Sequence, residues 1–572
     1  MKQEEVFNKL INDEDIEVKI SFARNPDTPP EVLEKLSQND EYKVREAVAY
    51  NPSTPLHILE KLSQDRKEDV RIGVVYNRSI TPELLDKLSN NEYMRVRLNV
   101  ARNPSTPANL LEKLSNDEHH WVRLMVAKNP NTPAKALEKL SQDWSEDVKL
   151  EVVKNPKTPS KAIERLLYTK LSKDKDKEEE KKLAVAHHPN TPADILFSLS
   201  NDKDWRVRKS VASHPNANIN TLEKLSEDKN ENIRIAVARN KNTTIDILSK
   251  LSRDRKKWVR ASVVINPNTP IDILEKLAED KDNDVRRVVA GHPSISQETL
   301  IKLANDENEW TRKNATKNPN ITVETLEKLA NSRYIDVREA VAKNPKTPQE
   351  ILEKLSNDEN RGVRKATIYN DCPTTINILK KLSNDKYDDV RAAVALNPKT
   401  PIDILEKLSD DDWWVRLHVA KNPSTPLHIL EKLSQDEDKY VKKSVAKHSF
   451  TPSYILAKLA DDEDEDVRKA VAENKNTPKE TLMKLSQDEN WEVRRFVASN
   501  PNTPVDALEK LSQDEDEWVR RKVASNQNST PEIFVKLLND KSWIRAEVAQ
   551  NPSIGKIEVS QPHPKKSISP SM

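Results

Sequence analysis

Apolar and polar positions follow each other in one recurring order along nearly the whole chain. The stretch from Asn129 to Val148, NPNTPAKALEKLSQDWSEDV, shows this unit, and close copies begin at Asn51, Asn397 and Asn500. When each unit is anchored on the residue before its recurrent Arg or Lys, there are 21 units, and 16 of the 20 intervals are 26 residues. A fixed period of this length predicts a solenoid in which stacked units share one continuous core.

Each unit contains the pattern of two short helices. In the first, apolar residues at i, i+4 and i+5, such as Val467, Val471 and Ala472, form a narrow stripe on one helical face. Asn-Pro ends this helix, because the residue before proline is pushed out of the helical region. The second helix begins at Thr-Pro, where Thr132 is expected to be the N-cap and Pro133 the first helical residue. Helices this short need their neighbours for stability, so the pattern predicts an all-α solenoid of about 21 two-helix repeats.

The array has one clear interruption and one end without the pattern. The interval between Val148 and Lys181 is 33 residues, and the extra material lies around residues 167–182, LYTKLSKDKDKEEEKK. We expect a lengthened second helix followed by a charged loop, which is either a solvated insertion or a docking or hinge element. Residues 553–572 are rich in Ser, Pro and Lys and are expected to be a disordered tail. The solenoid is therefore expected over residues 1–552.

Composition narrows the class of protein. Only four glycines are present among 572 residues, against 35 prolines, which favours helices over tight turns and phosphate-binding loops. The 95 basic and 94 acidic residues give a net charge of +1, so global charge gives no reason to expect nucleic acid or an anionic membrane. No apolar signal segment or membrane span is visible, and a cytoplasmic protein is expected.

The motif V-R-x-x-V-A-x-N-P-x-T-P-x-x-x-L-x-x-L-x-x-D resembles the variant leucine-rich repeat family, a relative of HEAT-like α-solenoids, over roughly residues 5–552. This resemblance implies a right-handed superhelix of alternating short helices, one of them of 3₁₀ character, and an interaction scaffold. The slightly longer period here favours a fully α first helix. Some members carry a cysteine-ligated iron–sulfur cluster, but the lone Cys372 lies in the middle of the array, so no cofactor is expected.

Stacking in register would turn each recurrent residue into a row of side chains. The position after the anchor is basic in all 21 units, for example Arg45 and Arg71. Such a row could hold a phosphate backbone. Most units also place an Asp a few residues upstream, such as Asp65 and Asp254. We therefore favour capping and pairing between repeats, with bidentate Arg–carboxylate geometry.

Two further rows recur. The residue that usually precedes proline is Asn in 17 units and His188, His214, His292 or His448 in the others, and it is expected to bond backbone groups between repeats. The adjacent histidine pairs lack ligand spacing, so no metal site is expected. A basic residue recurs in the second helices from Lys35 to Lys536, usually after Glu. We interpret that row as a solvated, laterally paired surface, with a track for polyanions as the alternative.

Tryptophans are the least regular positions and the best candidates for partner binding. They precede the anchor by one or two residues, in what the pattern makes an inter-repeat loop. There they would either cover the edge of the stack or anchor a protein or peptide. The candidates are Trp121, Trp205, Trp258, Trp310, Trp413, Trp414, Trp491 and Trp518. The adjacent Trp413 and Trp414 are the preferred patch.

No motif indicates catalysis: the chain has no phosphate loop, nucleophile elbow or HExxH, and no cysteine nucleophile with its partners. Carboxylates recur in every unit, whereas an enzyme needs one unique constellation. We therefore expect a non-enzymatic scaffold for protein–protein interaction, with no cofactor and an unidentified protein partner. Nucleic-acid binding through the Arg and Lys rows is the alternative.

Overall fold

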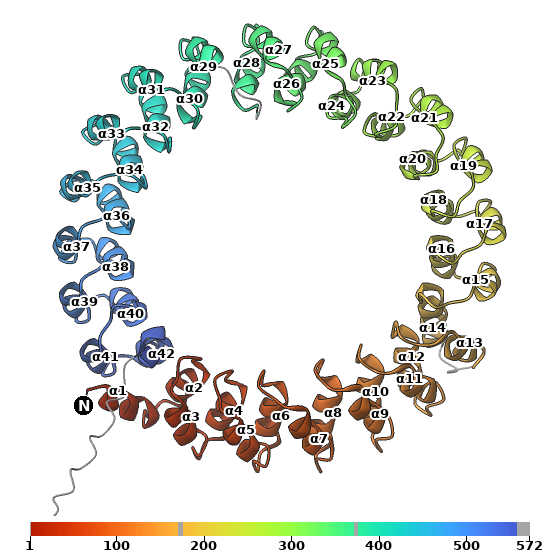
Figure 1. Ribbon diagram of the computed structural model, residues 1–572, viewed down its shortest axis with the longest axis horizontal. Coiled ribbons are helices and arrows are strands. Elements are labelled where there is room, and N and C mark those ends of the chain that lie inside the picture. Colours follow the sequence, from red (N-terminus) through yellow and green to blue (C-terminus); the bar gives the residue numbers. More distant parts are fainter. Residues whose placement is uncertain (1, 170–174, 371–375, 557–572) are drawn as a thin grey trace, which may run out of the picture. The chain divides into compact units, whose positions relative to one another are not determined.

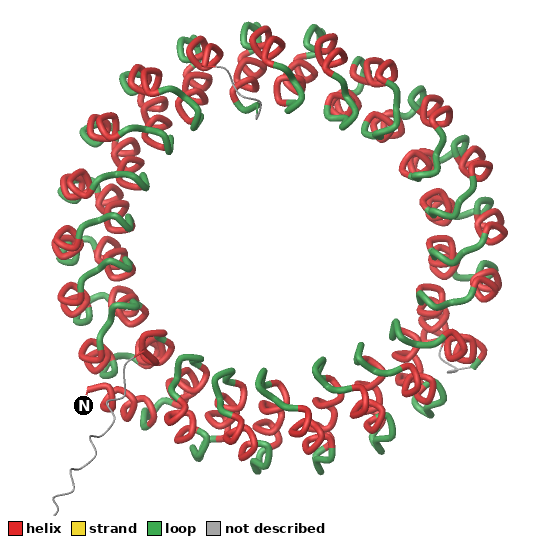
Figure 2. Tube along the Cα trace, in the orientation of Figure 1, coloured by secondary structure: helices red, strands yellow, loops and turns green. Residues whose placement is uncertain are grey.

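The protein is described by a computed structural model, which defines residues 2–169, 175–370 and 376–556. Within these ranges the chain forms 42 α-helices, one 3₁₀-helix and no β-strand (Figure 2). The predicted all-α array of two-helix repeats is confirmed. The 3₁₀ character implied by the family resemblance is absent from the described repeats, whose helices are all α-helices.

The helices belong to two compact units: unit 1 comprises Met1–Asn103 and Leu427–Met572, and unit 2 comprises Pro104–Pro426. The helices of unit 1 are α1 (Lys2–Ile11), α2 (Ile16–Arg24), α3 (Pro30–Leu36), α4 (Tyr42–Tyr50), α5 (Leu56–Leu62), α6 (Glu68–Tyr76), α7 (Pro82–Ser89), α8 (Met94–Arg102), α33 (Leu427–Leu433), α34 (Lys439–Lys447), α35 (Ser453–Leu459), α36 (Glu465–Glu473), α37 (Lys479–Leu485), α38 (Trp491–Ser499), α39 (Val505–Leu511), α40 (Glu517–Ser525), α41 (Pro531–Leu537), α42 (Ser542–Gln550) and the 3₁₀-helix η1 (Pro552–Lys556).

The helices of unit 2 are α9 (Ala108–Leu114), α10 (His120–Lys128), α11 (Ala134–Leu140), α12 (Glu146–Lys154), α13 (Ser160–Tyr168), α14 (Lys175–His187), α15 (Ala193–Leu199), α16 (Trp205–Ser213), α17 (Ile219–Leu225), α18 (Glu231–Arg239), α19 (Ile245–Leu251), α20 (Lys257–Ile265), α21 (Ile271–Leu277), α22 (Asn283–Ala290), α23 (Gln297–Ala304), α24 (Glu309–Thr316), α25 (Val323–Leu329), α26 (Ile335–Lys343), α27 (Gln349–Leu355), α28 (Arg361–Ile368), α29 (Ile376–Leu382), α30 (Asp388–Leu396), α31 (Ile402–Leu408) and α32 (Trp413–Lys421).

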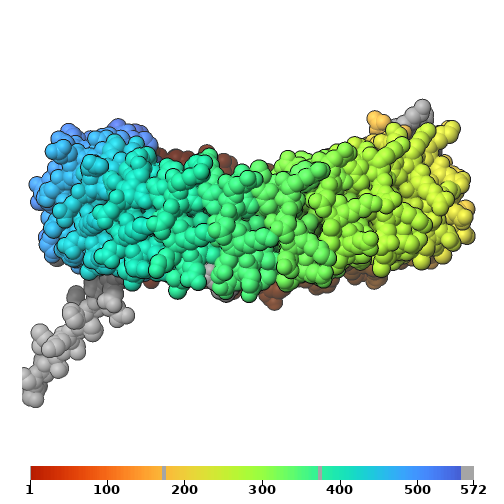
Figure 3. All heavy atoms as spheres, turned by 90° about the horizontal axis from the view of Figure 1, so that it is seen from above, coloured from red at the N-terminus to blue at the C-terminus, as the bar shows by residue number. Residues whose placement is uncertain are grey.

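In each unit the helices form two layers. The even-numbered helices, which are the first helices of the repeats, form one layer on the concave side, and the odd-numbered helices form the other (Figure 1). Successive repeats of unit 2 pack side by side as parallel ridges (Figure 3). The core lies between the layers, where the anchor valines and the leucines of the odd-numbered helices are buried. The right-handed superhelix implied by the resemblance stays a prediction.

The first helix of each repeat is defined by its two ends, as α36 illustrates. Asp464 is its N-cap and accepts a hydrogen bond from the backbone N–H of Asp466. Val467 and Val471 are fully buried on the predicted stripe. Asn474 ends the helix in an extended conformation, with φ −69° and ψ 127°. The predicted helix and its stop are therefore both present.

The second helix begins differently from the prediction. In α11 the N-cap is Pro133, and the hydroxyl of Thr132 donates instead to the carbonyl of Val126, at 2.5 Å, near the end of the preceding helix α10. The threonine thus gives a second hydrogen bond to a carbonyl at a helix C-terminus, which also accepts from the backbone N–H of Asn129, and it ties the two helices of one repeat together. The predicted geometry is found in α7, where Thr81 caps the backbone N–H of Leu84.

The asparagine row joins neighbouring repeats through buried hydrogen bonds, as predicted. Asn266, which is 1% exposed, donates from Nδ2 to the carbonyls of Ala238 at 2.7 Å and Asn240 at 2.8 Å in the preceding repeat. Two of the histidines at this position bond the preceding repeat through one ring nitrogen: His188 Nε2 lies 2.8 Å from the carbonyl of Asn155, and His214 Nε2 lies 2.9 Å from that of His188. Each repeat is therefore fixed in register on the one before it.

Replacement of Asn266 by alanine is expected to lower the local stability of α18–α20 by about 2–4 kcal/mol, because it leaves two buried carbonyls without their side-chain donor. Hydrogen exchange of the amides in these helices would measure the change. The matched control is Asn344→Ala, since Asn344 is half-buried and donates to a single carbonyl, that of Thr316. Its expected cost is about 1 kcal/mol, and equal effects of the two variants would contradict the prediction.

The longer interval around residues 167–182 lengthens both flanking helices. The second helix α13 has nine residues, as predicted, and the first helix α14 has thirteen. The predicted charged loop is wrong for residues 175–182, which are helical and belong to α14; residues 170–174 lie outside the described residues. The anchor residue Lys181 is fully buried, and its Nζ donates to the carbonyl of Thr169 at 2.7 Å and pairs with Glu178 at 2.7 Å. A buried lysine thus holds the end of α13, at a position that is apolar in every other repeat except that of Thr311.

The N-terminal repeat of unit 1 packs against the C-terminal repeat of the same unit, α1 against α41 and α2 against α42. Arg545 binds Asp13 through two bonds of 2.9 and 3.0 Å. Asn25 donates to the carbonyls of Ala549 at 2.9 Å and Asn551 at 3.3 Å. These are the contacts that join consecutive repeats, so the first repeat stacks on the last as if it followed it in sequence. The end of the chain also contributes η1; residues 557–572 of the predicted tail lie outside the described residues.

Candidate binding surface

The arginine row is engaged in buried pairs between repeats. Arg260 binds Asp280, in the loop that joins α21 to the next repeat, through Nε–Oδ2 and Nη2–Oδ1 bonds of 2.6 and 2.7 Å, and the two side chains are 7% and 8% exposed. Burial alone would raise the pKa of Asp280, but hydrogen bonds from Arg260 and from the backbone of Asp282 outweigh it and keep that pKa below its usual value. The predicted pairing between repeats is confirmed. The N-cap of the following helix, α22, is not Asp280 but Asp282, whose side chain accepts from the backbone N–H of Asp284.

The lysine row of the odd-numbered helices is exposed and paired laterally. Lys61 lies 2.9 Å from Glu34 and Lys536 lies 2.7 Å from Glu509, each pair joining two neighbouring repeats. These contacts match the predicted surface. Exposed pairs of this kind add little stability, but they cancel much of the field that a polyanion would sense.

The sequence pattern placed the candidate tryptophans in the loops between repeats. In the structure they occupy the first turn of even-numbered helices instead. An Asx N-cap starts several of these helices before the tryptophan, as Asp412 does for α32. All eight side chains are exposed, from 39% for Trp414 and Trp491 to 60% for Trp310. They are Trp121 in α10, Trp205 in α16, Trp258 in α20, Trp310 in α24, Trp413 and Trp414 in α32, Trp491 in α38 and Trp518 in α40.

Trp413 and Trp414 form a small aromatic cluster on α32. Their ring centroids are 5.6 Å apart in an edge-on arrangement, and the ring of His418 lies 4.6 Å from Trp414. Burial lowers the pKa of His418, whose Nδ1 lies 2.7 Å from the carbonyl of Trp414. The neutral imidazole therefore extends an amphipathic aromatic surface, which is the kind of group that anchors protein interfaces.

The other candidate rings do not contact one another, and all but Trp121 lie beside a cation of their own helix. The ring of Trp121 lies against that of His120, with centroids 4.8 Å apart. Lys313 lies 4.8 Å from the centroid of Trp310, and Arg495 lies 5.4 Å from that of Trp491. Among the described residues, Trp413 and Trp414 are the one pair of tryptophans in ring contact. The structure therefore brings two of the eight candidates together and distributes the rest along the concave layer as single exposed rings.

Sequence reasoning missed an apolar row on the odd-numbered helices. Ile219, Ile245 and Ile271 are the first residues of α17, α19 and α21, and each is 54–56% exposed. The signal was present, because an aliphatic residue directly follows the helix-start segment in these three successive repeats. Three adjacent repeats of unit 2 therefore present apolar side chains on the convex layer as well.

The histidine pairs have structural partners. His187 Nδ1 lies 2.9 Å from the carbonyl of Leu183, and its Nε2 lies 3.0 Å from the hydroxyl of Ser210. Over residues 2–169, 175–370 and 376–556, no three His, Cys, Asp or Glu side chains are grouped so that they could hold a metal ion. None of the helices in these same ranges has the length and apolar character that crossing a membrane requires.

Comparisons with known proteins find similar repeats in part of the chain. The family model described as leucine rich repeat variant matches eight segments of the chain. They are residues 42–66, 94–119, 120–143, 335–360, 388–412, 413–438, 465–490 and 491–516. Each matched segment runs from the start of an even-numbered helix through the following odd-numbered helix. The comparison with curated proteins finds no match.

Solved structures with related folds include a leucine-rich repeat variant with a novel repetitive protein structural motif. It is 26% identical over 39% of this chain and 87% of its own, with a TM-score of 0.32. The karyopherin Kap121p bound to the SUMO protease Ulp1p is 11% identical over 91% of this chain and 76% of its own, with a TM-score of 0.30. Kap95p, in a structure with RanGDP, is 11% identical over 97% of this chain and 72% of its own, with a TM-score of 0.24.

Proposed function

We propose that this chain, a leucine-rich repeat variant solenoid, is a protein-interaction scaffold that binds through the concave layer of its even-numbered helices. The observation that carries the proposal is the series of exposed tryptophans in the first turns of these helices. Exposed aromatic rings are costly to leave in water and are enriched where proteins bind each other. The rows of charge beside them are largely self-paired, so the rings dominate what a partner would contact.

The same geometry supports binding over catalysis and over nucleic acid. Acidic and basic groups recur in most repeats in the same pairs, such as Arg234 with Asp254 and Arg494 with Asp514, with side chains 6–10% exposed. Groups used in this way stack the repeats and are not poised for proton transfer. Guanidiniums held by carboxylates are also withheld from phosphates, which disfavours the alternative of a nucleic-acid track.

The test is recovery of partners by crosslinking in the native host, with the double variant Trp413→Ala, Trp414→Ala compared with the wild type. We expect at least one directly crosslinked protein to be recovered at least fivefold less with the double variant, because aromatic anchors at interface centres cost about 2 kcal/mol or more each. Trp144→Ala is the matched control, since Trp144 is 72% exposed and lies outside the even-numbered helices.

A second arm separates the two layers of the solenoid. The variant Ile219→Asn, Ile245→Asn, Ile271→Asn removes the apolar row of the convex layer and is expected to leave the same partner bound. Loss of the partner in this variant, with full recovery in the tryptophan variant, would show that the partner binds the odd-numbered helices instead. Unchanged recovery in both variants would refute binding through either set of apolar side chains.

A further inference from the structure

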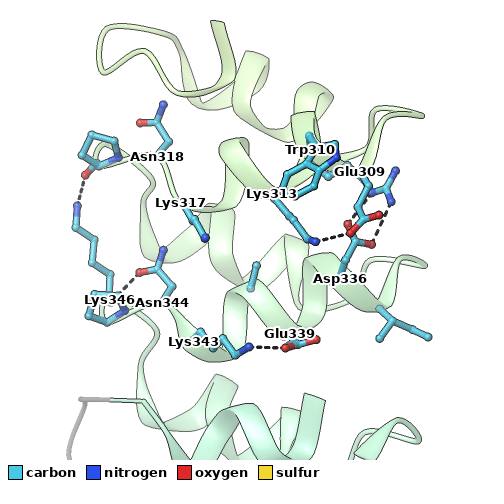
Figure 4. A pocket seen from close by; sticks show the side chains of 15 residues that line it. Glu309, Trp310, Lys313, Lys317, Asn318, Asp336, Glu339, Lys343, Asn344 and Lys346 are labelled. Carbon is cyan, nitrogen blue, oxygen red and sulfur yellow. Dashed lines mark hydrogen bonds and ion pairs between the residues drawn. The ribbon is translucent and has the colours of Figure 1, made fainter. Parts of the chain in front are cut away.

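A pocket of about 800 Å³ opens in unit 2 between the even-numbered helices α24 and α26 (Figure 4). Trp310, Lys313 and Lys317 line it from the first helix and its end, and Ile335 and Lys343 line it from the second. This volume is in the range of pockets that hold a ligand. It lies on the same layer as the tryptophans that carry the proposed function.

The pocket forms where the pairing between repeats changes. In most other repeats the arginine binds the aspartate 20 residues later, as Arg338 binds Asp358. At the pocket that position is Ser332, and Arg312 reaches instead to Asp336 on α26, with bonds of 3.1 and 3.2 Å. The aspartate that most repeats place 20 residues after the arginine is thus missing at this junction, as it also is after Arg71, where that position is Asn91.

The asparagine row is also interrupted here. Asn318 and Asn370, in the flanking repeats, each donate to two carbonyls of the repeat before. Asn344 donates only to Thr316, at 2.9 Å. The carbonyl of Asn318 accepts from the backbone N–H of Ile321 at 3.1 Å but, among the described residues, from no side-chain donor. The pocket therefore presents one amide donor and one carbonyl acceptor, the two groups with which an extended peptide backbone pairs.

The charges of the pocket do not balance. Its lining contains five cationic and three anionic side chains. Each carboxylate is engaged by one cation: Asp336 by Arg312, Glu309 by Lys313 and Glu339 by Lys343. Of the two remaining cations, Lys346 donates to the carbonyl of Pro319.

The other remaining cation is Lys317, which lies between Asn344 and Lys313 (Figure 4). No ion pair or hydrogen bond of its ammonium group is formed within the described residues. The two excess positive charges thus face the pocket without a carboxylate, and an anionic ligand would supply what they lack.

We propose that this pocket binds an acidic, extended peptide segment of a protein partner. Its carboxylates pair with Lys317 and Lys346, its backbone pairs with the amide of Asn344 and the carbonyl of Asn318, and an apolar side chain packs on Trp310 and Ile335, which are 60% and 45% exposed. The assignment rests on the proposed scaffold function and adds the chemistry of one ligand segment.

Fluorescence anisotropy with labelled hexaglutamate, titrated with the purified full chain, tests the proposal. We expect Lys317→Gln, Lys346→Gln to weaken binding at least tenfold and Trp310→Ala to weaken it severalfold. The matched control is Lys128→Gln, Lys157→Gln, which removes two exposed lysines at the equivalent positions of α10 and the repeat of α12. The asparagine row is intact there, since Asn155 donates to both Ala127 and Asn129, so this control is expected to change affinity less than twofold.

Two further ligands separate charge from backbone recognition. Labelled hexaglutamine is expected to bind at least tenfold more weakly than hexaglutamate, and a backbone N-methylated hexaglutamate severalfold more weakly. If the control variant Lys128→Gln, Lys157→Gln loses as much affinity for hexaglutamate as Lys317→Gln, Lys346→Gln, the peptide binds to scattered surface charge and the proposal is overturned. A single-stranded oligonucleotide that displaces hexaglutamate from the pocket and binds more tightly would overturn it in favour of a nucleic acid.

The outcome is independent of the crosslinking experiment. Failure of hexaglutamate to bind, with partners still lost in the Trp413→Ala, Trp414→Ala variant, overturns the pocket and leaves the scaffold. Hexaglutamate binding that follows the lysines, with no partner recovered in cells, supports the pocket and overturns the scaffold.

Discussion

Replacement of Arg260 by methionine is expected to destabilise the repeats around α20–α22 by about 3–5 kcal/mol, although methionine fills most of the space of the arginine stem. The substitution removes both bonds to Asp280 and the bond from Nη1 to the carbonyl of Asp254 at 2.8 Å. Breaking a buried pair by deleting one partner costs this much because the other charge stays buried without compensation. Hydrogen exchange of the amides in α20, α21 and α22 would measure the loss.

The pH dependence of that loss identifies its cause. Because the pKa of Asp280 is lowered in the folded protein, the stabilisation by the pair is present above the unfolded value of about 3.9 and is lost as pH falls through the lower folded value. The difference between wild type and Arg260→Met should therefore shrink below about pH 4. The control Lys276→Met removes an exposed pair with Asp272 and should cost at most about 0.5 kcal/mol. A loss for Arg260→Met that does not change between pH 7 and pH 3 would point to packing in place of the pair.

The sequence was most informative where one repeat resembles the next. The buried stripe of Val467 and Val471 and the backbone role of Asn266 follow from spacing alone, because a period of 26 residues brings identical positions into contact. The pairing of Arg260 with Asp280 follows in the same way. Thr132 was misplaced because Thr-Pro is a common helix start, and the competing acceptor, the carbonyl of Val126, belongs to the end of another helix.

Departures from the repeat carry the information that periodicity cannot give. Ser332 in place of an aspartate was visible in the sequence, but whether its neighbours close over the gap or leave a pocket depends on the packing of α24 on α26. The tryptophans were assigned to loops because they precede the anchor residue of each unit. In the structure an Asx N-cap starts the helix before the tryptophan, which therefore lies in the first helical turn. At the ends of the array the signal was a mismatch: Asp13 has no arginine before it, and Arg545 has no aspartate after it.

That mismatch leads to the second large effect. Reversal of the charge at Asp13, by Asp13→Arg, is expected to separate the first repeat from the last within unit 1. Arg545 and Asp13 are 13% and 7% exposed, so the substitution replaces a buried bidentate pair by two facing guanidiniums. Loss of the pair alone is worth about 3–5 kcal/mol.

The ends can be followed by crosslinking. Ser21 and Gln550 lie on opposite sides of the junction, with Gln550 Nε2 3.3 Å from Ser21 Oγ. In a chain with Cys372→Ser, cysteines at these two positions should be joined within one molecule by a short bismaleimide. We expect Asp13→Arg to reduce the intramolecular product at least fivefold. Asp506→Arg, which reverses an exposed charge on α39, should leave it unchanged.

The physical reason to expect a closed junction lies in the terminal repeats themselves. A solenoid normally ends in repeats with a polar outer face, because an uncovered repeat exposes core residues. Here Val6 and Leu10 of α1 and Phe22 of α2 are all fully buried, and these two helices pack against α41 and α42. Opening the junction should therefore expose apolar surface, and the Asp13→Arg variant should self-associate as its concentration rises.

The two ends form a heterologous interface, which can join one chain to itself or to another copy. Crosslinked dimers of the wild-type chain at low concentration would show that the second arrangement prevails and would contradict the intramolecular junction.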